Sequence, residues 1–146
     1  MGAHPWFYFI PSEKDITKGL EALREREFKA GRYNPSEPFP GFPVDPQRLP
    51  GSKHSSIEAA RAAAGAGGTR SILDMTRISP TPDFGAVAPL DDAELMDLCG
   101  TVKPARADIE TSEAIFEQIE RGQGIYIVVY ENNEPSQVYF AGYSYD

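Results

Sequence analysis

The amino-acid sequence predicts a single α+β domain with a small antiparallel sheet. Two observations lead to this prediction. The 146 residues include ordinary shares of hydrophobic (40%) and charged (25%) residues, and β-favouring runs at both ends enclose amphipathic segments. A chain of this length buries roughly two-thirds of its unfolded surface without disulfides or metals. We therefore expect one domain over residues 1–146, with two main helices on one face of the sheet.

The N-terminal third begins with a strand and a helix. Residues 6–10, Trp-Phe-Tyr-Phe-Ile, favour a first strand that is buried on both faces. Ser12 offers an N-cap for an amphipathic helix over 12–30, which Gly31 ends. Six prolines within 34–51 exclude regular structure there. We expect this proline-rich segment to be an ordered loop that covers a sheet edge, with a functional loop as the alternative.

The middle of the chain alternates short elements with loops. Ser55 and Glu58 have the spacing of a capping box, which predicts an Ala-rich helix over 56–64. Apolar residues then favour a strand near 69–77, as the third component of the sheet. The prolines and glycine of 79–90 predict a second loop.

Two helices and a hairpin are expected in the second half. Asp91 caps a short helix that ends at Gly100, and a longer helix over 104–121 starts at Pro104. The β-rich runs 125–130 and 137–143 then form a hairpin whose turn has four residues.

The hairpin pattern also predicts a register. If Ile127 pairs with Phe140, each face of the hairpin holds a consistent set of side chains. One face then presents Ile125, Ile127, Val129, Val138 and Phe140. The other face presents Tyr126, Val128, Tyr130, Tyr139 and Ala141.

The charge of the chain is strongly uneven. The net charge is −8. Residues 1–73 hold ten Lys and Arg against eight Asp and Glu, a net of +2, whereas residues 74–146 hold four against fourteen, a net of −10. An acidic field repels phosphate backbones and anionic lipids and attracts basic surfaces. We therefore expect neither nucleic acid nor a membrane as a direct partner.

Four glutamates form the first candidate site. Their spacing of i, i+3, i+7 and i+10 would place them in one line on the 104–121 helix, without basic partners within helical reach. Asp91 and Asp92 add charge on the preceding helix. Such a face either keeps the protein soluble or docks a basic protein. The four glutamates are Glu110, Glu113, Glu117 and Glu120.

Three tyrosines form the second candidate site. Tyr126, Tyr130 and Tyr139 share one face in the expected register, and tyrosine suits interfaces because it has an apolar body and a polar tip. Either these rings are covered by a helix or by the proline-rich segment, or they form a contact for a partner or a homodimer.

A third hypothesis places a small-ligand or enzyme pocket between the proline-rich segment and the sheet. Its candidate polar groups are His54, Arg70, Asp74 and Arg77. Two histidines and one cysteine show none of the short spacings of metal motifs, and the chain carries no phosphate loop, dinucleotide fingerprint or nucleophile elbow. We therefore expect neither a metal nor a cofactor.

Together these patterns favour binding over catalysis. One thiol and no visible secretory leader are typical of the cytoplasm. We expect a small acidic cytoplasmic protein that occludes a basic protein partner, as a bacterial immunity protein or an inhibitor that mimics nucleic-acid charge does. The alternative is the small enzyme or ligand-binding protein of the third hypothesis.

Overall fold

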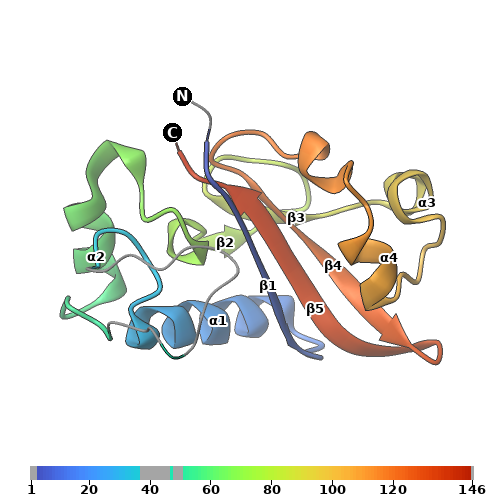
Figure 1. The fold of residues 1–146 in the computed structure, drawn as a ribbon, viewed down its shortest axis with the longest axis horizontal. Helices are drawn as coiled ribbons and strands as arrows, with labels where there is room; N and C mark the ends of the chain where they lie inside the picture. Colours follow the sequence, from blue (N-terminus) through green and yellow to red (C-terminus); the bar gives the residue numbers. More distant parts are fainter. Residues whose placement is uncertain (1–2, 37–46, 48–50, 146) are drawn as a thin grey trace.

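One mixed sheet forms the centre of the fold. The computed structural model describes residues 3–36, 47 and 51–145. Within them, five strands are arranged in the order β1-β5-β4-β3-β2 (Figure 1). β1, β5 and β4 pair antiparallel, whereas β3 and β2 run parallel to β4. The α+β character is confirmed, but the expectation of a purely antiparallel sheet is wrong. The strands are β1 Pro5–Pro11, β2 Arg77–Ile78, β3 Ala86–Pro89, β4 Gly124–Glu131 and β5 Glu134–Tyr143.

The parallel part of the sheet differs most from the prediction of a strand near 69–77 and a loop over 79–90. Ile72–Asp74 forms a 3₁₀ turn, because the Ser71 hydroxyl accepts a hydrogen bond from the backbone N–H of Leu73 (3.2 Å). β3 lies inside the expected loop, and three of its four residues are buried. An interior parallel strand is covered on both faces and shows no alternating pattern, so the sequence offered little sign of it.

Helices cover both faces of the sheet. α1 (Ile16–Ala30) and α2 (Ile57–Ala64) lie on one face, and α3 (Asp92–Cys99) and α4 (Arg106–Glu110) lie on the other (Figure 1). The prediction of two main helices on one face is therefore wrong, and each side of the sheet has its own hydrophobic cluster. None of the described helices combines the length and the hydrophobicity that crossing a bilayer requires.

The helix boundaries follow their capping residues. α1 begins after Asp15, whose carboxylate accepts a hydrogen bond from the backbone N–H of Lys18 (3.3 Å), and not at the predicted Ser12. Its predicted end is confirmed, since Gly31 has the left-handed φ of 73°. α2 follows Ser56, one residue after the predicted cap. The capping box at the start of α3 is confirmed.

The predicted helix over 104–121 is wrong. α4 has only five residues, and Ile115–Gln118 forms a separate 3₁₀ helix, η4. Between them, the Ser112 hydroxyl donates a hydrogen bond to the backbone oxygen of Leu98 (2.8 Å). A hydroxyl that bonds the backbone offers an alternative to continued helix. This bond also ties the end of α4 to α3.

The C-terminal hairpin is confirmed, but its register differs by one residue from the predicted one. Asn132 and Asn133 form a two-residue turn with φ of 53° and 64°, and hairpin turns with positive φ at both positions favour asparagine. A register shift between Val129 and Tyr130 follows this turn, and the two together pair Ile127 with Tyr139 instead of Phe140. A shift of one residue moves side chains to the opposite face of a strand, so Tyr139 lies on the same face as Ile127.

Trp6 packs across two glycines that face each other on neighbouring strands. Gly124 of β4 pairs with Gly142 of β5, and a Cβ at Gly142 would lie 2.3 Å from the indole ring of Trp6. The indole therefore occupies the space that a side chain at Gly142 would need, and it is completely buried. This packing joins β1 to β4 across β5.

β1 is buried on one face only. The prediction that both of its faces are buried is wrong. Trp6, Tyr8 and Ile10 are buried, whereas Phe7 is 37% exposed and Phe9 is half-buried. β1 is the last strand on its side of the sheet, so the elements that cover the second face reach it only in part. The expectation that the proline-rich segment covers a sheet edge falls almost wholly outside the described residues and stays a prediction.

We predict that Gly142→Ala lowers the free energy of unfolding by about 2 kcal/mol, because the added methyl group overpacks the Trp6 indole. Urea unfolding measures this change. In a Trp6→Phe background the same substitution should cost less, because the contact with the indole is removed and only the contact with the backbone oxygen of Gln123 (2.7 Å) remains. Equal costs in the two backgrounds would show that the indole does not limit this position.

Candidate functional site

The four glutamates that were predicted to share one helix face lie on separate segments. Glu110 ends α4, Glu113 follows in a turn, Glu117 lies in η4 and Glu120 comes after it. All four are exposed. Glu110 is paired with Arg106, whose Nε lies 3.0 Å from its carboxylate, contrary to the expectation of an unpartnered stripe. Among the described residues, the other three glutamates form no ion pair.

Asp91 and Asp92 are exposed at the start of α3. The Asp91 carboxylate accepts a hydrogen bond from the backbone N–H of Glu94 (2.7 Å) and so caps the helix. A carboxylate at this place is stabilised by the free N–H groups of the first turn. Asp91 therefore has a structural role, and neither aspartate lines the groove described below.

The single tyrosine face predicted on the hairpin is wrong. The observed register places Tyr126 and Tyr130 on one face and Tyr139 on the other. Tyr126 packs against Phe140 in the cluster beneath α1, with ring centroids 6.3 Å apart. The homodimer hypothesis therefore loses the common surface on which it was based.

A groove of about 280 Å³ lies on the second face of the sheet, between β1 and the segment of α4 and η4. Ile109 and Tyr139 are buried in its floor, and Glu110 and Glu113 are exposed at its border. The fold thus brings together three of the predicted partner-binding residues, Glu110, Glu113 and Tyr139. The remaining lining residues are Phe7, Phe9, Ser112 and Phe116.

Aromatic rings make up much of the groove. The Tyr139 ring centroid lies 4.8 Å from that of Phe9 and 6.4 Å from that of Phe7. Phe116 lies on the opposite wall and makes an edge contact with Tyr143, with ring centroids 5.5 Å apart. Ring faces attract cations, because the π-electrons give them negative charge.

One guanidinium already lies against this aromatic surface. The Cζ of Arg106 is 3.9 Å from the centroid of the Phe9 ring, while its Nε bonds the Glu110 carboxylate at 3.0 Å. Arg106 and Glu110 are one helical turn apart on α4, the spacing at which such side chains meet. The pair neutralises Glu110, so Glu113 is the carboxylate that remains for a ligand.

Tyr139 presents a neutral phenol to the groove. Burial raises the pKa of Tyr139 well above its usual range, and the nearby Cys99 and Glu110 raise it further. The hydroxyl is neutral at physiological pH, so among the described residues the unpaired negative charge of the groove belongs to Glu113.

Sequence reasoning missed the phenylalanines of the groove. Phe7 and Phe9 alternate with the buried residues of β1, a spacing that was visible, but the whole aromatic run was interpreted as buried. That β1 is an edge strand follows only from the pairing of distant segments. Phe116 lies within the expected 104–121 helix, and that helix does not form.

The four polar residues of the alternative pocket do not form one cluster, although the backbone N–H of Arg70 bonds the Asp74 carboxylate and acts to lower its pKa. His54 Nδ1 is 2.8 Å from the hydroxyl of Tyr33. Arg70 has a left-handed backbone with φ of 55°, Arg77 is the first residue of β2, and Asp74 is buried. Three grooves lined by described residues include none of the four. Because the pocket was expected against the proline-rich segment, the hypothesis extends beyond the described residues and stays a prediction.

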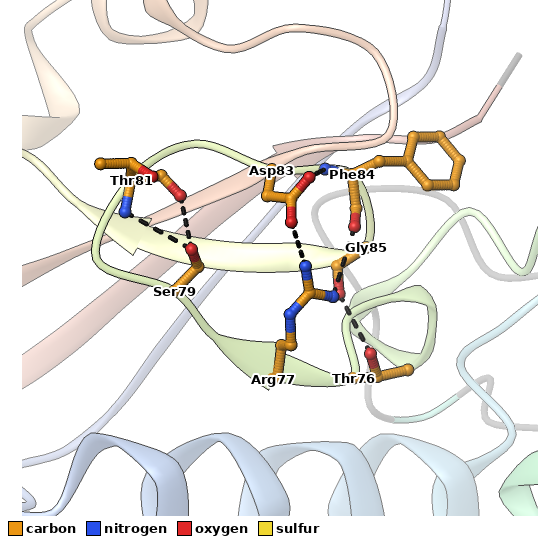
Figure 2. Close-up of polar contacts among 7 residues, drawn as sticks. All are labelled: Thr76, Arg77, Ser79, Thr81, Asp83, Phe84 and Gly85. Atoms are coloured by element: carbon orange, nitrogen blue, oxygen red, sulfur yellow. Dashed lines mark hydrogen bonds and ion pairs between the residues drawn. The ribbon is translucent and has the colours of Figure 1, made fainter.

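Arg77 holds the loop between β2 and β3 closed. Figure 2 shows its guanidinium directed at the Asp83 carboxylate, with which it forms an ion pair, and at the backbone oxygen of Phe84, which accepts a hydrogen bond from Nη1 (3.5 Å). In the same loop the Ser79 hydroxyl donates to the backbone oxygen of Thr81 (2.7 Å). These contacts give Arg77 a structural role.

Asp74 carries a buried carboxylate in the turn before β2. Its Oδ1 accepts hydrogen bonds from the backbone N–H (2.7 Å) and the hydroxyl (2.8 Å) of Thr69. Burial raises the pKa of Asp74, while the bonds from Thr69 and the charge of Arg61 act in the opposite direction. The ionised carboxylate is therefore a cost to the folded state.

Comparison with known proteins assigns the chain to no family. The chain matches no protein-family model, no curated protein and no solved structure. The functional interpretation therefore depends on the chemistry of the groove.

We predict that the free energy of unfolding of the Asp74→Asn variant increases relative to that of the parent protein as the pH rises from about 4 to 7. The unfolded carboxyl ionises near its ordinary pKa of 3.8, whereas the folded one holds its proton to higher pH. The parent therefore loses stability across this window, and the variant does not. Urea unfolding at several pH values measures the difference between them.

Asp97→Asn is the matched control, because Asp97 is exposed on α3. The difference in free energy of unfolding between this variant and the parent should change little over the same pH range. If the Asp74 and Asp97 variants show the same pH dependence, burial does not control the Asp74 carboxyl.

Proposed function

We propose that the protein binds a basic protein partner, and that the groove between β1 and α4–η4 receives a cationic side chain of that partner. The observation that carries the proposal is the combination of an aromatic lining with the Glu113 carboxylate at its border. Cations bind the faces of aromatic rings, and a nearby carboxylate adds direct charge pairing.

The size of the groove supports a side chain as its occupant. Pockets for cofactors and drug-sized ligands measure roughly 300 to 1,000 Å³, and this groove has a volume of about 280 Å³. A groove at the lower end of this range has room for a single large side chain of a partner.

The charge of the second half supports a basic partner. Two of its four basic residues are used locally, because Arg77 pairs with Asp83 and Arg106 pairs with Glu110. Glu117 and Glu120 are exposed beyond the groove and extend the acidic surface. Such a field steers a basic partner toward the groove and repels acidic competitors, and its effect falls with added salt.

Inhibition is the consequence we propose for this binding. A protein that covers a cationic surface blocks whatever anion that surface normally binds, which is how an immunity protein or a nucleic-acid mimic acts. The net charge of −8 on 146 residues is the observation that favours this mode.

We predict that Glu113→Lys abolishes capture of basic proteins from a lysate of the source organism, whereas Glu117→Lys retains it. Both substitutions change the net charge equally, and both positions are exposed, but only Glu113 lines the groove. Immobilised parent and variant proteins are compared at low ionic strength by quantitative mass spectrometry.

Two outcomes contradict the proposal. Equal losses for both variants would show that the general acidic field retains these proteins without the groove. If the parent and the two variants captured the same basic proteins in equal amounts, neither glutamate would take part in binding.

A further inference from the structure

We infer that the groove recognises an arginine side chain of the partner, in preference to lysine. The inference rests on the proposed function and specifies its ligand. It depends on the guanidinium that the chain already holds against the Phe9 ring, and on the other residues that line the groove.

Arg106 shows what this surface binds. Its guanidinium lies over the Phe9 ring at 3.9 Å while bonding the Glu110 carboxylate at 3.0 Å. A planar guanidinium can stack on a ring and donate hydrogen bonds in its own plane at the same time. The contact needs an aromatic face and a carboxylate at its border.

The same two components recur within the groove. Tyr139 and Phe116 supply aromatic surface, and Glu113 supplies a carboxylate that forms no ion pair with any described residue. The Ser112 hydroxyl donates to the backbone oxygen of Leu98, and the Tyr139 phenol is neutral, so neither adds a second charge to the groove. A second guanidinium that stacks here and bonds Glu113 would repeat the Arg106 arrangement.

Lysine fits this lining less well. An ammonium group is compact, strongly hydrated and needs acceptors in three directions, whereas a guanidinium is more weakly hydrated and has flat faces without donors. The groove offers mostly ring surface and one available carboxylate. The unpaired Glu113 carboxylate at the border disfavours an anionic group.

The test is an NMR titration of the isotope-labelled full chain with three small probes: N-acetyl-arginine amide, N-acetyl-lysine amide and N-acetyl-citrulline amide. The arginine probe should shift the signals of Phe9, Phe116 and Tyr139 in a saturable way. The lysine probe should bind about fivefold more weakly, since it loses the stacking contact. The citrulline probe has nearly the same shape without the charge and should leave these signals unchanged.

Matched variants locate the contact. Glu113→Gln should weaken arginine binding about fivefold, whereas Glu117→Gln should leave it unchanged. Phe116→Leu keeps an apolar wall but removes its ring, and it should weaken the arginine probe more than the lysine probe. The backbone signals of each variant report that its fold is retained.

Several results would overturn the inference. Equal binding of the arginine and lysine probes at the groove would remove the arginine preference and leave the proposed function intact. Shifts outside the groove, or no binding of any probe, would reject the groove as an arginine site. If Glu113→Lys and Glu117→Lys also retained the same proteins, the proposed function would fail as well.

Discussion

The packing of Trp6 across Gly124 and Gly142 determines where the N-terminal strand lies. The indole fills the space above two paired glycines of β4 and β5, and a methyl group at Gly142 would collide with it. Because side chains alternate along a strand, burying Trp6 on one face directs Phe7 and Phe9 to the other. One contact between the two ends of the chain therefore positions half of the groove.

The opposite wall depends on the early end of α4. The Ser112 hydroxyl bonds the backbone of Leu98, and the chain turns so that Glu113 and Phe116 face β1 instead of continuing along a helix. Arg106 joins the two walls, since it contacts Phe9 of β1 and Glu110 of α4. The groove is thus assembled from distant segments, which explains why no short motif marks it.

Elements with local signals were predicted well. The cap at Asp91, the glycine that ends α1 and the Ala-rich run of α2 act within one or two helical turns. Elements that depend on distant partners were not. β3 has no pattern of its own, and the register of the hairpin differs because Asn132 and Asn133 form a tighter turn than expected and a register shift follows between Val129 and Tyr130. For the same reason Glu110, Glu113 and Tyr139 were identified as binding candidates without the geometry that unites them.

The sequence by itself determined the net charge, its concentration in the second half, the cap at Asp91 and the glycines that end α1 and α3, because these follow from residue identity and short-range hydrogen bonds. The tertiary structure alone decided which carboxylates are neutralised, which aromatic rings share a face and where a cation can bind. These properties require side chains from β1, β5 and the α4–η4 segment to meet in space. Their meeting depends on packing between residues more than a hundred positions apart, such as Trp6 and Gly142.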